Sequence, residues 1–97
     1  MRSISRQPSG IDKILETGLG SPVKIRILML LARTREDLSR YAVDKGAQAS
    51  DQDAARALKT LVELGWVLEL QGKPIKYRLN RDNAIVGHLA EFFAKAL

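Results

Sequence analysis

Apolar residues recur along most of this chain at intervals of three and four positions, which is the spacing of one face of an α-helix. Four segments show this pattern before residue 65, and they are 10–17, 22–33, 34–47 and 51–64. Ser21, Pro22 and Ser50 are residue types that begin helices, and Gly65 is of the type that ends them. We therefore predict four consecutive helices, of which 22–33 is apolar enough to be the central one.

The boundaries between these helices carry further signals. Thr34 with Asp37, and Ser50 with Asp53, have the spacing of a capping box, in which both side chains satisfy free backbone amides at a helix start. These pairs would begin the third and fourth helices. The glycines of segment 18–20 are expected to break the chain between the first helix and the second.

Beyond residue 65 the pattern favours strands. Residues 66–70 are mostly apolar, and in residues 75–79 every second residue is apolar. The segment 71–74 between them has the composition of a turn, so we predict a β-hairpin. A last helix at about 84–96 carries two adjacent apolar stripes, which is more apolar surface than one small core needs.

The order of these elements predicts a mostly helical α+β fold: a winged helix-turn-helix with a two-stranded β-hairpin as its wing and a C-terminal helix. Residues 1–9 are polar and basic and are expected to form a flexible tail, which leaves 10–97 as a single domain. No apolar run approaches the roughly 20 residues of a membrane span, and the N-terminus lacks a secretory pattern. We therefore expect a cytoplasmic protein that does not enter a membrane.

The distribution of charge adds a functional indication. The chain has 16 Lys and Arg against 11 Asp and Glu, a net charge of +5. Residues 72–81 contain no acid, and their cations are Lys73, Lys76, Arg78 and Arg81. Such a cluster is either a solvated loop or a surface that contacts phosphate, because Lys and Arg displace counterions from nucleic acids. The overall balance favours an anionic partner.

Other chemistries have little support in the sequence. With no cysteine and one histidine, no nucleophile–base set can be assembled, so we expect neither an enzyme nor a cofactor. His88 and Glu91 could supply half of a metal site across a dimer, but a packed or surface histidine is the favoured interpretation. Segment 18–21 lacks the Lys of a phosphate loop. Trp66 and Tyr77 could stack on single-stranded bases, although burial is favoured for both.

Three segments resemble the ArsR-like winged helix-turn-helix regulators. Residues 19–31 (LGSPVKIRILMLL) are similar to the opening helix of that family, residues 58–67 (LKTLVELGWV) to the end of its recognition helix, and residues 73–80 (KPIKYRLN) to its returning wing strand. The resemblance extends over about residues 11–97. It implies a dimeric transcriptional regulator that binds double-stranded DNA, with residues 50–64 as the recognition helix.

The resemblance also implies roles for individual residues. The recognition helix would present to the major groove Gln52, Ala55, Arg56 and Lys59. The wing would contact phosphate or the minor groove through Lys73, Lys76 and Arg78. The first and last helices would form a homodimer interface from Ile11, Ile14, Leu15, Ile85, Val86, Leu89, Phe92 and Phe93.

Asp51 and Asp53 depart from the family pattern, which usually has Ser, Thr or Gln at the start of this helix. Carboxylates there favour the helix dipole but repel phosphate, and an Asp can also accept a hydrogen bond from cytosine. Capping is the favoured role for both. These acids support a second hypothesis, in which the winged helix contacts another protein in a larger assembly, whereas the basic wing supports DNA binding.

Overall fold

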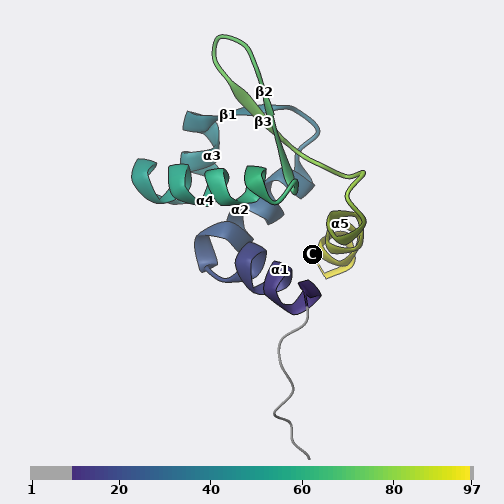
Figure 1. The fold of residues 1–97 in the computed structure, drawn as a ribbon. Coiled ribbons are helices and arrows are strands. Elements are labelled where there is room, and N and C mark those ends of the chain that lie inside the picture. Colours follow the sequence, from purple (N-terminus) through teal and green to yellow (C-terminus); the bar gives the residue numbers. More distant parts are fainter. Residues whose placement is uncertain (1–9, 97) are drawn as a thin grey trace, which may run out of the picture.

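Five helices and a three-stranded antiparallel sheet make up residues 10–96, the part of the chain that this computed structural model describes. In chain order the elements are α1 (Gly10–Leu19), α2 (Pro22–Arg33), β1 (Leu38–Ser39), α3 (Arg40–Gly46), α4 (Asp51–Glu63), β2 (Val67–Leu70), β3 (Lys76–Leu79) and α5 (Ala84–Ala96). This order confirms the mostly helical α+β class and is consistent with a winged-helix topology (Figure 1). The flexible tail predicted for 1–9 lies outside the described residues.

Helix α2 is the central element of the fold, as its apolar sequence predicts. The Ser21 hydroxyl accepts a hydrogen bond from the Lys24 amide at 3.2 Å, and Pro22 occupies the first helical position. Helices α1, α3, α4 and α5 and strand β3 all contact α2. Its fully buried side chains are Ile27, Leu28 and Leu31. No helix in residues 10–96 has the length and apolar character needed to cross a membrane.

The segment after α2 differs from the prediction. Thr34 does not begin a helix but is the C-cap residue of α2, and the next helix, α3, begins at Arg40. The Ser39 hydroxyl caps α3 by accepting a hydrogen bond from the Ala42 amide at 3.2 Å. Strand β1 ends at this capping serine, because the extended backbone of Leu38 and Ser39 pairs with β3, with Leu38 opposite Tyr77. The sheet therefore has three strands, in the order β1-β3-β2, where a two-stranded wing was expected.

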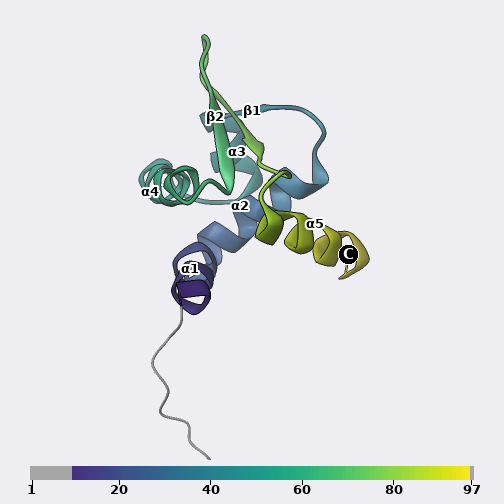
Figure 2. The same ribbon diagram turned by 45° about the vertical axis from the view of Figure 1, so that its right-hand side comes forward.

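The predicted β-hairpin is present. Strands β2 and β3 pair antiparallel, with Val67 opposite Leu79 and Leu70 opposite Lys76. Along β3 the side chains alternate between buried and exposed, as the sequence pattern predicts. We call residues 67–79 the wing, and its tip extends beyond the helices at the top of Figures 1 and 2.

Trp66 fills the core beside α1, where it is 1% exposed. A Cβ atom added at Gly18 would overlap the Cζ3 and Cη2 atoms of this indole ring. Helix α1 continues through Gly18 and ends at Leu19. The break between the first two helices, predicted at 18–20, therefore begins only at Gly20. Glycine at position 18 allows close contact between α1 and Trp66 rather than ending the helix.

Gly18→Ala should therefore destabilise the protein by about 1–3 kcal/mol, because the added methyl group must displace a buried indole. The matched control is Gly87→Ala, which is also inside a helix but whose added Cβ would lie 3.6 Å from the nearest atom, an ordinary contact. That change should be neutral or stabilise by up to about 1 kcal/mol. Urea unfolding of both variants measures the difference. Equal stability of the two would contradict the close α1–Trp66 packing.

Helix α5 places one of its two apolar stripes in the core. It begins after Asn83, whose side-chain oxygen accepts hydrogen bonds from the amides of Ile85 and Val86 at 3.0 and 3.1 Å. Val86 is 0% exposed and Phe93 is 8% exposed, because α5 packs against α2. This corrects the assignment of Val86 and Phe93 to the dimer surface. Part of the apolar surface of the last helix, which the sequence suggested was more than one core needs, is therefore buried in the core of the same chain.

Candidate nucleic-acid interface

Helix α4 exposes one side along most of its length. Ser50 caps it as predicted, since its hydroxyl accepts a hydrogen bond from the Asp53 amide at 3.1 Å. Gly65, with a left-handed φ of 77°, follows its C-terminal end. The side facing the core consists of Ala54, Ala57, Leu58 and Leu61. Among the side chains that remain exposed are Gln52, Arg56 and Lys59.

Three of the four predicted base-contacting residues of α4 line two different hollows of the surface, and Gln52 lines neither of them. Ala55, which is half-buried, and Lys59 line a groove of about 380 Å³ between α4 and the sheet. Arg56 lines a different hollow, toward the start of α2, together with Lys24. The structure thus brings Ala55 and Lys59 together near the wing, and it places Arg56 beside Lys24 of α2.

The groove between α4 and the wing has mixed charge. Arg40 and Lys59 line it, and so do Glu63 and Glu69. Tyr77 also lines it, and its hydroxyl donates a hydrogen bond to Glu69 at 3.2 Å. Burial, reinforced by the Glu69 carboxylate, raises the pKa of Tyr77 above its ordinary value, so this hydroxyl stays protonated and able to donate.

The two aspartates at the start of α4 are both paired with arginines. Asp51 forms a close ion pair with Arg40 of α3, which lowers the pKa of the Asp51 carboxyl. Asp53 accepts a hydrogen bond from the Arg56 guanidinium at 3.3 Å. Ser50 is the N-cap, as the predicted capping box requires, and both carboxylates lie in the first turn of α4, where the helix dipole favours them. Each carboxylate also neutralises a cation on the same surface.

The wing carries two unpaired cations and one paired cation. Lys73 and Lys76 are exposed, and no carboxylate of residues 10–96 lies within 4 Å of either. Arg78 instead donates two hydrogen bonds to the carboxylate oxygens of Asp37, at 2.8 and 3.1 Å. This bidentate contact lowers the pKa of Asp37, which the sequence had placed in a capping box. Arg78 thus ties the wing to the segment before β1 and is not a free phosphate ligand.

The surface predicted for dimerisation is partly available. Ile11, Ile14 and Phe92 are exposed, and Phe92 has 62% of its surface accessible. Three others are only partly exposed and pack against the core, namely Leu15, Ile85 and Leu89. Helices α1 and α5 lie at the end of the molecule away from the wing tip (Figure 2).

The remaining candidate residues are placed as follows. Trp66 and Tyr77 are 1% and 7% exposed, which confirms the favoured burial of both. His88 is exposed on α5, and within 10–96 no three His, Asp or Glu side chains gather in a way that could hold a metal ion. Segment 18–21 consists of the last two residues of α1 and of Gly20 and Ser21, which connect α1 to α2.

No protein-family model matches the chain, and no curated protein matches its sequence. The molecule's own geometry is therefore what indicates a function. Its most informative feature is the exposed side of α4, next to a hairpin whose Lys73 and Lys76 pair with no carboxylate that the structure describes.

Proposed function

We propose that the protein is an ArsR-like, dimeric transcriptional regulator that binds double-stranded DNA at specific sequences. The observation that carries this proposal is the exposed polar side of α4 beside the basic wing (Figures 1 and 2). α4 is the second helix of the α3–α4 pair, the position of the recognition helix in a helix-turn-helix. An α-helix with its side chains is about 10–12 Å wide and fits the major groove, which is about 12 Å wide.

In this proposal α4 reads bases and the wing contacts the backbone. Arg56 pairs with guanine and Gln52 with adenine, the geometries that these side chains favour in the major groove. Arg56 must leave Asp53 to do so, which costs little because the pair is exposed at the surface. Lys59, Lys73 and Lys76 contact phosphates and contribute affinity without sequence preference.

The proposed assembly is a homodimer with a two-fold symmetric DNA site. Phe92 of α5 and the isoleucines of α1, Ile11 and Ile14, offer exposed apolar surface at the end away from the wing tip. Pairing through this end leaves α4 and the wing of both copies free to contact DNA. Each α4 would then occupy a major groove, with half-sites a whole number of helical turns apart.

The salt dependence of duplex binding tests the proposal. Asp37→Asn should strengthen binding and steepen the slope of log K against log salt by about one unit, because it releases Arg78 for phosphate. Lys76→Ala should flatten the slope by about one unit, and Arg78→Ala by less, since Asp37 already neutralises that arginine. Fluorescence anisotropy of a labelled duplex between 50 and 200 mM salt measures all three slopes.

Glu91→Gln is the control for net charge, because it removes one carboxylate from α5, the element the proposal places away from DNA. It should leave the slope close to that of the unmodified protein. A slope that rises equally in Asp37→Asn and Glu91→Gln would show that only total charge matters. Duplex binding that does not depend on salt at all would overturn the proposal.

The second candidate function is contact with another protein in a larger assembly. The carboxylates of Glu63 and Glu69 in the groove between α4 and the wing favour it, because they oppose the approach of phosphate. Under this alternative the same groove receives a basic or polar segment of a partner. Duplex binding would then stay weak and without sequence preference, whatever residue stands at position 56.

A further inference from the structure

A second basic surface lies on the other side of the wing from α4. The α2–β1 connection passes there, as both views of the ribbon show (Figures 1 and 2). Between the end of α2, this connection and the end of β3 is a cavity of about 540 Å³. Four of its nine lining residues are arginines, Arg33, Arg35, Arg78 and Arg81, and its one acid is Glu36. The volume is in the range typical of small-molecule sites.

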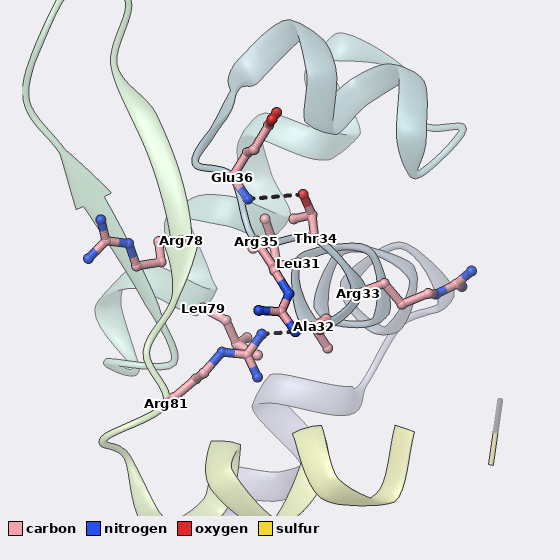
Figure 3. A pocket seen from close by; sticks show the side chains of 9 residues that line it. All are labelled: Leu31, Ala32, Arg33, Thr34, Arg35, Glu36, Arg78, Leu79 and Arg81. Atoms are coloured by element: carbon pink, nitrogen blue, oxygen red, sulfur yellow. Dashed lines mark hydrogen bonds between the residues drawn. The ribbon is translucent and has the colours of Figure 1, made fainter. Parts of the chain in front are cut away.

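Two of the four arginines point into this cavity. In Figure 3 the guanidinium groups of Arg35 and Arg81 point toward one another, whereas those of Arg33 and Arg78 point outward. Arg78 is held by Asp37 outside the cavity. Arg35 and Arg81 therefore form the positive centre of the cavity, and we call them the arginine pair.

No carboxylate that the structure describes neutralises the arginine pair. Neither guanidinium has a carboxylate within 4 Å, and the Glu36 carboxylate points away from them in Figure 3. Arg81 donates a hydrogen bond to the Ala32 carbonyl at 3.1 Å, a favourable position for a cation at the C-terminal end of α2. That contact stabilises the Arg81 guanidinium in its position. The Arg35 guanidinium points toward this second cation, and none of the described residues offers it an opposite charge.

We infer that the arginine pair binds an oxyanion of the phosphate class in this cavity. Guanidinium groups present several N–H donors in a rigid plane, which match the oxygens of phosphate, and an anion between two of them removes their mutual repulsion. The phosphate can belong to a small molecule or to a nucleic-acid backbone, since the arginine pair contacts only the oxyanion. The inference does not rest on DNA binding by α4, which lies on the other side of the wing.

A titration followed by NMR tests the inference on the full chain. Inorganic phosphate and then pyrophosphate are added to ¹⁵N-labelled protein at constant ionic strength, and the Nε–H signals of Arg35 and Arg81 are monitored. Saturable shifts of both signals are expected. Arg35→Gln should weaken the binding about tenfold or more, because it removes a charge-assisted contact. Lys95→Gln, which removes one positive charge from the exposed surface of α5, should not change it.

Arg81→Gln should weaken the binding to a similar extent, but it also removes the hydrogen bond to Ala32. Circular dichroism shows whether this variant folds. If it does not fold, the result of Arg35→Gln tests the inference alone. That change breaks no hydrogen bond or ion pair of the Arg35 side chain to the residues that the structure describes. A third titration with a short DNA duplex distinguishes the two sources of phosphate. Saturation by duplex alone identifies the backbone, and saturation by pyrophosphate without any response to duplex identifies a free ligand.

Two results would overturn the inference. One is a linear, non-saturable shift of both arginine signals with phosphate, pyrophosphate and duplex alike. The other is an equal loss of binding in Arg35→Gln and Lys95→Gln, which would reflect net charge alone. Neither result bears on the proposed function, because duplex binding through α4 and the wing is measured by the slopes of the Lys76 and Asp37 variants.

Discussion

Replacing Phe93 by glutamate should unfold the protein, whereas the same change at the adjacent Phe92 should leave it folded. The two rings are edge-to-face neighbours with centroids 5.9 Å apart, yet Phe93 is 8% exposed and Phe92 is 62% exposed. A carboxylate at position 93 would be buried without a partner, which costs several kcal/mol. That cost is comparable with the total stability of about 5–15 kcal/mol expected for a folded protein. At position 92 the carboxylate stays in water.

Circular dichroism and light scattering at tens of micromolar separate these effects. The unmodified protein should be a folded dimer, Phe92→Glu a folded monomer, and Phe93→Glu an unfolded or aggregated chain. Val86→Glu should behave like Phe93→Glu, since Val86 is 0% exposed. A folded Phe93→Glu variant would contradict the packing of α5 against α2. An unmodified protein that is monomeric at these concentrations would contradict the proposed homodimer.

Arg56→Ala and Gln52→Ala should relax the sequence preference of DNA binding, whereas Lys59→Ala should weaken binding to all sequences. Each correct pairing of Arg with guanine or Gln with adenine discriminates by about 1–3 kcal/mol, roughly 5- to 150-fold in affinity. Lys59 is exposed at the border of the groove between α4 and the wing, where a phosphate can approach it. Competition of a preferred duplex against its single-base variants measures the loss of discrimination. An unchanged ratio in Arg56→Ala would exclude this arginine from base reading.

Asp53→Asn distinguishes two roles of this acid in the proposed complex. If Asp53 only pairs with Arg56, as the 3.3 Å contact indicates, the change should raise affinity for every duplex by removing a negative charge. If its carboxylate accepts a hydrogen bond from cytosine, the Asp53→Asn protein should instead lose its preference for cytosine at one base pair. The helix itself should persist in both cases, because the Ser50 hydroxyl and not Asp53 caps it.

The parts of the fold that the sequence predicts correctly are those set by local chemistry. Ser21 with Pro22 begins α2, Ser50 begins α4, and strict alternation marks β3. The failure at Thr34 has a definite cause. Its spacing to Asp37 matches a capping box, but the backbone of this segment pairs with a strand that lies about 40 residues further along the chain. Such pairing leaves no local pattern in a strand of two residues.

In the candidate site, too, the sequence predicts the features that depend on local spacing and misses those that depend on distant residues. Periodicity places Gln52, Arg56 and Lys59 on the exposed side of α4, where the structure has them. It cannot show that Arg78 pairs with Asp37, 41 positions away, or that Arg40 pairs with Asp51, 11 positions away, in addition to its neighbour Asp44. Likewise, periodicity reveals two apolar stripes on α5 but not which of them α2 covers.

Selection of bound sequences from a pool of random duplexes distinguishes specific DNA recognition from contact with another protein. The unmodified protein should enrich a two-fold symmetric site, and Arg56→Ala should lose enrichment of guanine at one position in each half-site. A pool that stays unenriched with the folded, unmodified protein would contradict specific DNA recognition and favour the role of a protein-contact module.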